Sequence, residues 1–182
     1  MPRNAEPVRR RLQETALALF TQHGYEAVTA AEIAAAAGVT ERTFFRHFPD
    51  KREVLFGGEQ ELAPALRQAI AEAAGTKPLK ILTAAFRALE PHLLRNRPFA
   101  LPRAHVIEAN PALRERELTK RAALQTAATE ALITRGTPPR QAALAAQVGM
   151  ALFTQAIQDW MQDPAADFNH QLTKAQSDLK TL

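Results

Sequence analysis

The sequence predicts an all-α protein. Alanine is abundant among its 182 residues, only seven residues are glycine, and no alternating run of Val, Ile or Thr indicates a strand. Apolar residues recur instead at intervals of three and four, which is the spacing of one face of a helix. Because hydrophobic residues make up 46% of the chain, it has enough apolar surface to bury a core.

The N-terminal region predicts two helices joined by a short loop. The first covers about residues 7–23 and ends at Gly24, since glycine commonly follows the end of a helix. The second covers about residues 30–37. Thr29 and Glu32 mark its start, because they have the T-x-x-E spacing of a capping box.

A third, short helix is predicted over residues 41–47, after the turn Gly38-Val39-Thr40. Thr40 is a good N-cap, and Pro49 ends the helix because proline lacks the N–H that a helix interior needs. A turn of three or four residues that contains glycine is typical of the helix-turn-helix motif. The first three helices therefore predict a three-helix domain of this kind.

The rest of the chain predicts further helices. Asp50 is placed to cap a fourth helix that reaches about residue 74, although Gly57 and Gly58 each weaken it by about 1 kcal/mol relative to alanine. A helix from Leu79 is interrupted or kinked at Pro91, and we expect short helices and turns over the proline-rich residues 98–111. The remaining helices are predicted over about residues 112–135, 140–162 and 167–179.

The third helix separates aromatic from basic side chains. At about 100° per residue, Phe44 and Phe48 fall on one face, while Arg42, Thr43 and Arg46 fall on the other. The aromatic face can anchor the helix, which leaves the polar face projecting outward. Such a helix suits the major groove of DNA, where arginine is the commonest specific reader of guanine. Helical corners of this shape without a DNA function also exist, so the spacing alone leaves both interpretations open.

Three more residues stand at the starts of predicted helices, where exposed N–H groups and the helix dipole favour a phosphate. Thr29 and Thr40 are N-caps, and Lys51 begins the fourth helix. The arginines at residues 9–11 could also reach phosphates, or could simply be solvated.

The segment from Val28 to Leu55, VTAAEIAAAAGVTERTFFRHFPDKREVL, closely resembles the DNA-binding signature of the TetR family of bacterial transcriptional regulators. The shared pattern runs from a threonine that opens the second helix, through an Ile-Ala pair and a glycine turn, to a capped short helix with an aromatic pair. It ends with an aromatic-proline stop and a lysine. The first helix also fits, through ALALFTQHGYEAVT. Beyond residue 56 only the layout is similar, an alanine-rich helical second domain.

The resemblance implies a helix-turn-helix DNA-binding domain over residues 1–53 and an effector-binding and dimerisation domain over residues 54–182. It implies a regulator, a repressor by default, that binds a palindromic operator in double-stranded DNA as a homodimer and is released by a small-molecule effector. The DNA-binding residues that it implies are Thr29, Thr40, Arg42, Thr43, Phe45, Arg46, His47 and Lys51. Family members often carry tyrosine at positions 45 and 46, so here Phe45 would make apolar contacts and Arg46 would add a charge.

In the second domain the resemblance implies a dimer contact on the last two helices and an effector pocket between the fourth and eighth helices. Broad apolar stripes on the last two helices support the dimer, with an ordinary core as the alternative. The dimer candidates are Leu144, Val148, Ala151, Leu152, Gln155, Phe168 and Leu172, and the small residues Ala145, Gly149 and Ala156 would let helices approach closely. The effector candidates are Phe86, Leu89, His92, Phe99, His105, Phe153 and Trp160, and core packing is the alternative for each of them.

Composition bears on the other classes of function. The net charge of +4 permits nucleic acid as a partner, but residues 1–55 carry eight Lys and Arg against seven Asp and Glu, which argues against a non-specific DNA-coating protein. The chain has no cysteine and no common catalytic motif, so we expect no enzyme, metal or cofactor. The N-terminus does not read as a signal peptide and no apolar run of about 18 residues occurs, so we expect a cytoplasmic protein with no membrane contact. The alternative function is a helical ligand-binding or interaction module with a vestigial helix-turn-helix.

Overall fold

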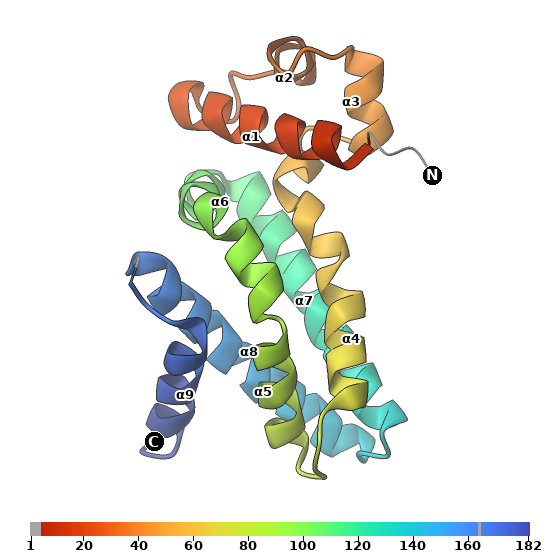
Figure 1. The fold of residues 1–182 in the computed structure, drawn as a ribbon, viewed down its shortest axis with the longest axis vertical. Coiled ribbons are helices and arrows are strands. Elements are labelled where there is room, and N and C mark those ends of the chain that lie inside the picture. The colour runs from red at the N-terminus through yellow and green to blue at the C-terminus, as the bar shows by residue number, and fades with distance from the viewer. Residues whose placement is uncertain (1–4, 164) are drawn as a thin grey trace. The chain divides into compact units, whose positions relative to one another are not determined.

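A computed structural model describes residues 5–163 and 165–182, and the regular structure in these residues is helical (Figure 1), which confirms the all-α prediction. The chain divides into two compact units. The first comprises the described residues up to Gln60 together with Phe99–Glu117, and the second comprises Glu61–Pro98 and Leu118–Leu182. These units describe packing and not function, so the boundary expected between residues 53 and 54 stays a prediction.

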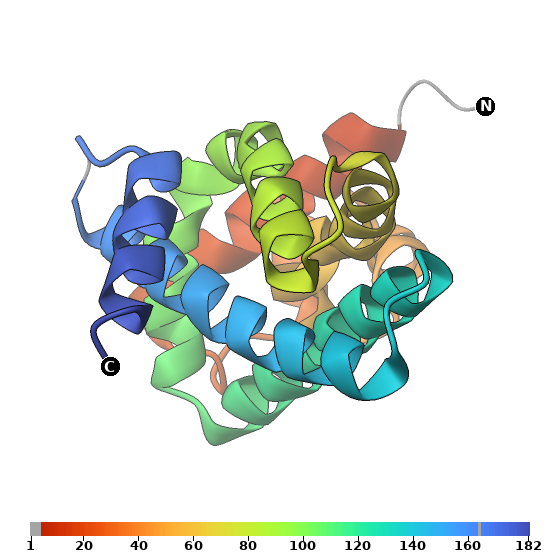
Figure 2. The same cartoon turned by 90° about the horizontal axis from the view of Figure 1, so that it is seen from below.

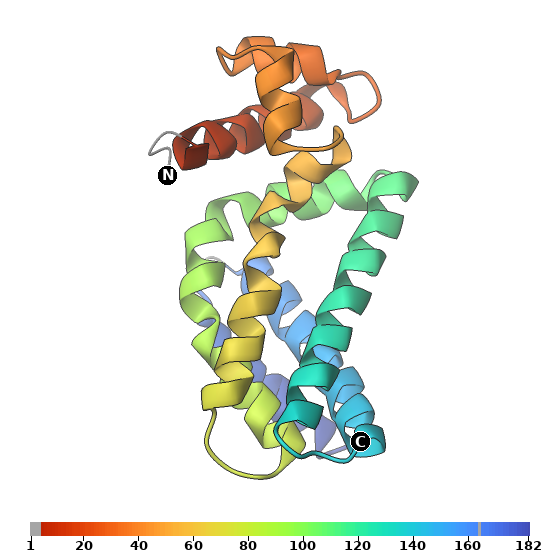
Figure 3. The same ribbon diagram turned by 90° about the vertical axis from the view of Figure 1, so that its right-hand side faces the viewer.

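The first unit begins with three helices, α1 (Ala5–His23), α2 (Ala30–Ala36) and α3 (Glu41–His47), and both short helices lie against α1 (Figures 1 and 3). Their bounds agree with the sequence prediction to within two residues. The core of this unit forms where the apolar stripe of α1 meets the buried faces of α2 and α3. Its fully buried side chains include Leu12, Ala16, Ile33, Phe44 and Phe48.

The predicted caps of α2 and α3 are confirmed. The hydroxyl of Thr29 accepts a hydrogen bond from the N–H of Glu32 at 3.2 Å, and the carboxylate of Glu32 accepts one from the N–H of Thr29 at 2.7 Å. At the start of α3 the hydroxyl of Thr40 accepts a hydrogen bond from the N–H of Thr43 at 3.2 Å. Gly38 lies between the helices with φ of 69°, a conformation that other residues rarely adopt.

The predicted continuous fourth helix is wrong. Residues Arg52–Gln60 form a 3₁₀ helix, η1, and only then does α4 (Leu62–Glu72) begin. Asp50 starts η1 as expected, since its carboxylate accepts a hydrogen bond from the N–H of Glu53 at 3.0 Å. A 3₁₀ segment of nine residues is unusually long. The adjacent glycines at positions 57 and 58 disfavour the α conformation, which explains the break.

The expectation of short helices and turns over residues 98–111 is also wrong. After α5 (Pro78–Ala88), helix α6 (Glu90–Glu108) runs without interruption through Pro98 and Pro102, and Pro91 lies in its first turn, where the missing N–H costs nothing. Contacts along the helix override the low helix propensity of proline. Near the middle Arg97 donates hydrogen bonds to two main-chain carbonyls, and near the C-terminal end Val106 and Ile107 are buried.

Helix α7 (Pro111–Thr134) begins at a cap formed by Asn110. The side-chain oxygen of Asn110 accepts hydrogen bonds from the N–H groups of Ala112 and Leu113 at 3.1 and 3.3 Å. At the other end of α7, the guanidinium of Arg135 donates hydrogen bonds to the carbonyls of Ala71 and Ala73, which lie at and just after the end of α4. These carbonyls are among the groups that the end of a helix leaves without partners, so Arg135 ties α7 to α4.

The second unit ends in an antiparallel pair of helices, α8 (Pro139–Gln162) and α9 (Phe168–Leu179), visible in Figures 1 and 2. Asp167 caps α9, because its carboxylate accepts a hydrogen bond from the N–H of His170 at 2.7 Å. Helix α8 also packs on α5. The fully buried side chains in this core include Leu66, Ile70, Leu82, Phe86, Phe168 and Leu172.

Gly149 lets α8 approach α5. A Cβ atom at this position would lie 2.3 Å from Cδ2 of Leu82 and 3.5 Å from the ring of Phe86. Non-bonded carbon atoms do not come as close as the shorter distance, so the buried side chain of Leu82 would have to shift to make room for a side chain here. Ala145 and Ala156 are also buried in this core. The small residues of α8 therefore serve packing inside the chain, where the sequence suggested packing between chains.

We expect Gly149→Ala to lower the free energy of unfolding of the second unit by about 1–3 kcal/mol, because the added methyl overpacks the contact with Leu82. An exposed glycine in a helix would show the opposite sign, since alanine is the better helix former. Denaturant unfolding followed by the fluorescence of Trp160, the single tryptophan, measures this change. In the double variant with Leu82→Ala the clash is removed, so the cost of Gly149→Ala should largely vanish; equal costs in both backgrounds would contradict the explanation.

Candidate functional site

The candidate site is the outer face of α3, and it depends on how α3 is anchored. Phe44 and Phe48 are 0% and 1% exposed, and their ring centroids lie 5.6 Å apart. Phe45 projects outward instead and is 47% exposed, with its ring edge-on to that of Phe44. Phe44 and Phe48 thus face inward, as the helical wheel predicted, whereas Phe45 lies at the surface.

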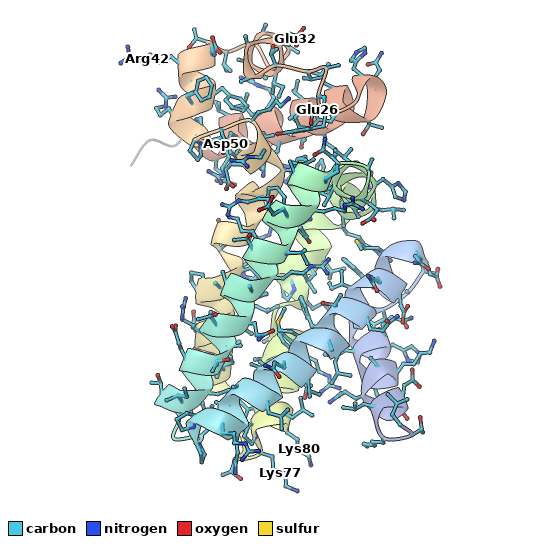
Figure 4. The ribbon with its side chains drawn as sticks, turned by 180° about the vertical axis from the view of Figure 1, so that it is seen from behind. Glu26, Glu32, Arg42, Asp50, Lys77 and Lys80 are labelled. Carbon is cyan, nitrogen blue, oxygen red and sulfur yellow. The ribbon has the colours of Figure 1, made fainter. Side chains whose placement is uncertain are left out.

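Arg42 and Arg46 are exposed on the outer face of α3. Figure 4 shows Arg42 directed away from the body of α3. Within the described part of the chain, neither guanidinium forms a salt bridge, whereas most other arginines of the first unit have carboxylate or carbonyl partners. Arg42 and Arg46 therefore offer charged donors that the fold itself does not use.

The three threonines of the candidate site are held by local hydrogen bonds. The hydroxyls of Thr40 and Thr43 lie 3.0 Å apart, and that of Thr29 lies 2.8 Å from a carboxylate oxygen of Glu32. The carboxylate of Glu32 accepts hydrogen bonds from the N–H and from the hydroxyl of Thr29. Both bonds lower the pKa of Glu32 below its usual range, and the bond from the N–H has the larger effect. The phosphate contacts of Thr29 and Thr40 and the groove-facing role of Thr43 stay predictions.

His47 lies at the end of α3, with its Nε2 atom buried and without a hydrogen-bond partner. Burial lowers the pKa of His47, and the nearby charges of Arg46 and Arg9 lower it further. The carbonyl of His47 accepts a hydrogen bond from Arg9 at 3.3 Å, and the Arg9 guanidinium lies 4.8 Å from the ring centroid of Phe48. Arg9 therefore packs on the anchored end of α3, and Arg10 pairs with Glu14 at 3.0 Å.

Lys51 has a position that the sequence did not indicate. Its Nζ atom donates hydrogen bonds to the carbonyls of Tyr25 and Val28 at 2.7 and 2.9 Å, and it lies 4.1 Å from the ring centroid of Tyr25. The partners are 26 and 23 residues earlier in the chain, so no local pattern could reveal them. The ammonium joins the start of η1 to the connection between α1 and α2.

An ion pair and a hydrogen bond tie η1 to residues 99–117 of the same unit. Glu53 is 7% exposed and pairs with Arg116, and the same contact raises the pKa of Arg116. Arg103 donates hydrogen bonds to the carbonyl of Leu55 at 2.6 Å and to the carboxylate of Glu117 at 2.9 Å. The side chain of Glu117 is 18% exposed and is thus a half-buried partner of Arg103.

The seven effector candidates are divided between the two units. Four of them are buried in the core of the second unit: Phe86, Leu89, Phe153 and Trp160. His92 belongs to the same unit and is half-buried. Phe99 and His105 belong to the first unit. There His105 lines an open groove of about 830 Å³ whose walls come from the end of α1, the loop that follows it and α6. Core packing, the alternative given by the sequence, describes the first four residues, and an effector role for any of the seven stays a prediction.

The seven dimer candidates fall into two groups. Leu152, Phe168 and Leu172 are 6%, 0% and 0% exposed, so they pack inside the chain and leave no surface for a partner. Their proposed place in a dimer contact is corrected on this ground. The other four remain accessible on α8: Leu144, Val148, Ala151 and Gln155.

The described geometry is that of a helix-turn-helix DNA-binding domain, and comparisons with known proteins agree with it. Residues 12–56 match the family model described as bacterial regulatory proteins, tetR family. Residues 76–181, more than half of the chain, match the model described as the MftR C-terminal domain. The chain belongs to the TetR family of transcriptional regulators.

Individual relatives show the same pattern. The HTH-type transcriptional regulator TcmR of Streptomyces glaucescens is 40% identical over 88 residues, which are 48% of this chain and 39% of TcmR. Two solved structures share the fold over more than nine-tenths of the chain. The fatty acid degradation regulator FadR of Bacillus halodurans has a TM-score of 0.62 at 17% identity and covers 94% of this chain and 93% of its own. Thermus thermophilus FadR, a repressor solved with lauroyl-CoA, has a TM-score of 0.51 at 27% identity and covers 93% and 91%.

The described residues contain neither a membrane-spanning helix nor a cluster of metal ligands. No helix there is long and apolar enough to cross a membrane. No cluster of three or more His, Asp or Glu in the same residues could hold a metal ion.

Burial raises the pKa of Tyr25 to about 12 from its usual 10.0, with the carboxylates of Asp50 and Glu26 adding to the effect and Arg52 opposing it. Tyr25 is the single tyrosine, so the phenolate absorbance of the folded protein should titrate near pH 12, and that of the denatured chain near pH 10. The folded state holds the proton more tightly, so this part of the stability is complete below pH 10 and is lost as the pH rises toward 12. In Tyr25→Phe the loss over that range should be smaller, and a folded midpoint near 10 would contradict the burial of the phenol.

Proposed function

We propose that this TetR-family regulator is a repressor that binds a palindromic operator as a homodimer and is released from it by a small-molecule effector. The observation that carries the DNA-binding part is the pair of exposed arginines, Arg42 and Arg46, on a helix that is anchored by two buried phenylalanines. A rigid helix with outward arginines suits direct reading of bases in the major groove. A protein that acts in this way would work in the cytoplasm, where the DNA of a bacterium lies.

The accessible side of α8 supports the dimer. Leu144 is 61% exposed. Val148 lies one turn further along α8 and Ala151 two turns further, so both continue the same side of the helix. An exposed leucine of this size next to small residues suits close packing against an identical helix. A two-fold dimer presents two recognition helices related by the same symmetry, which is why a palindromic operator is expected.

The effector part of the proposal rests on the second unit and on a relative. The candidates of this unit are mostly apolar and aromatic, so the ligand class that suits them has a large apolar portion. Thermus thermophilus FadR binds lauroyl-CoA, a molecule of that class, which makes a long-chain acyl thioester a sensible first probe for this chain.

The first test is selection of operator DNA from a random pool. We expect a palindromic sequence to be enriched, and Arg46→Ala to weaken its binding by about tenfold or more, since one bidentate base contact contributes about 1–3 kcal/mol. Arg140→Ala, which removes an exposed arginine from the second unit, is the matched control and should bind as the wild type does. A folded protein that enriches no sequence would favour the alternative, a helical ligand-binding or interaction module with a vestigial helix-turn-helix.

The dimer has its own test. Leu144→Asp combined with Ala151→Asp places two like charges on each side of the proposed contact, so sedimentation should show a monomer where the wild type shows a dimer. Leu118→Asp introduces the same charge at a leucine that is 65% exposed on α7 and should leave the dimer intact. A double variant that still sediments as a dimer would place the contact elsewhere.

A further inference from the structure

Lys51 differs from the arginines of α3 in how its charge is used. An ammonium has three N–H donors, and two of those of Lys51 point to the carbonyls of Tyr25 and Val28 at 2.7 and 2.9 Å. The same group sits against the face of the Tyr25 ring, 4.1 Å from its centroid, where a cation is attracted by the ring. These contacts form a three-sided socket, which we call the Lys51 socket: the two carbonyls and the aromatic ring.

The Lys51 socket lies where α2 begins. Val28 is 3% exposed, and its carbonyl is followed directly by Thr29, the N-cap of α2. The ring of Tyr25 packs edge-on against that of Phe20 in α1, with centroids 5.1 Å apart. One side chain from beyond α3 therefore holds the connection between α1 and α2 in place, and with it the start of the helix on which α3 rests.

Hydrogen bonds from a charged donor are stronger than neutral ones, so Lys51 would lose two good contacts by turning outward to a phosphate. Arg42 and Arg46 have no such contacts to lose within the described residues. Two of the three N–H donors of Lys51 are committed to main-chain carbonyls, so only the third could reach a phosphate while these contacts stay in place. The family resemblance implied a phosphate contact for Lys51, and the geometry favours a different role.

We propose that Lys51 is a positioning residue of the DNA-binding domain, which fixes the start of α2 through the main chain of Tyr25 and Val28, and that it does not bind a phosphate. This inference rests on the proposed DNA-binding function. It makes Lys51 necessary for the orientation of α2 and α3 and unnecessary for the charge that the domain presents to DNA.

The salt dependence of DNA binding separates the two roles. Each phosphate that a cation neutralises adds about 0.9 to the negative slope of log K against log salt concentration. Removal of a phosphate ligand therefore lowers that slope by about 0.9, whereas removal of a positioning residue lowers the affinity and leaves the slope unchanged. The variants are Lys51→Met, which keeps the stem without donors or charge, and Lys51→Gln, which keeps N–H donors without charge. Arg11→Met, which removes an exposed arginine of α1 that could reach a phosphate, is the comparison for a change in slope.

We expect Lys51→Met to lower affinity for the selected operator about tenfold at an unchanged slope, and Lys51→Gln to recover part of that loss, because its amide can still donate to a carbonyl. In the free protein, the main-chain amides of residues 29–33 should exchange hydrogen faster in Lys51→Met than in the wild type. A slope lowered by about 0.9 in both variants would overturn the proposal and make Lys51 a phosphate ligand, and so would wild-type affinity and exchange in Lys51→Met. If the wild type binds no DNA, the proposed function fails, but the exchange measurement still decides whether the Lys51 socket orders α2. If Lys51→Met does not fold, Lys51→Gln carries the same comparison.

Discussion

The burial of Phe44 and Phe48 is the contact on which the candidate site depends. Helix α3 has seven residues, and a helix of that length is not stable in water by itself. It exists because these two side chains, 0% and 1% exposed, pack among α1 and α2. Once they are buried, the helical repeat alone decides that Arg42 and Arg46 face outward. The packing of the hydrophobic core in the first unit therefore also determines the orientation of its charged face.

The features that could be predicted from the sequence are local ones. Thr29, Glu32 and Thr40 lie within three residues of the N–H groups or carboxylate that they contact, so their caps could be recognised by spacing. Helix α3 was predicted to the residue for the same reason. The Lys51 socket and the pair of Glu53 with Arg116 join residues far apart in the chain, and no local pattern carries that information.

The wrong predictions have two physical causes. The cost of proline was weighed without the tertiary contacts that compete with it, and the cost of two adjacent glycines was weighed too lightly. In α6 the contacts of Arg97, Val106 and Ile107 outweigh the cost of prolines within the helix, whereas near Gly57 and Gly58 the chain takes a 3₁₀ form and propensity prevails. Apolar periodicity has a related limit, because it marks a buried face without saying what buries it. The apolar stripes of α8 and α9 are an example. They suggested a contact between chains, but Leu152, Phe168 and Leu172 are buried within one chain.

Some basic side chains of residues 1–55 are held by contacts within the protein, and others are exposed to solvent. This difference explains how a region with almost no net charge can suit DNA. Residues 1–55 carry eight basic and seven acidic side chains, so the sum of charges gives little attraction. Several of the basic groups are held by carbonyls, carboxylates or aromatic rings: Arg9, Arg10, Lys51 and Arg52. Arg42 and Arg46 are exposed on α3 and have no salt bridge within the described residues, and the nearest acidic neighbours in sequence, Glu41 and Asp50, lie outside the helical face that they form. What attracts a phosphate backbone or a guanine edge is the local field of such unshared charges, which depends on where each cation is used and only weakly on how many there are.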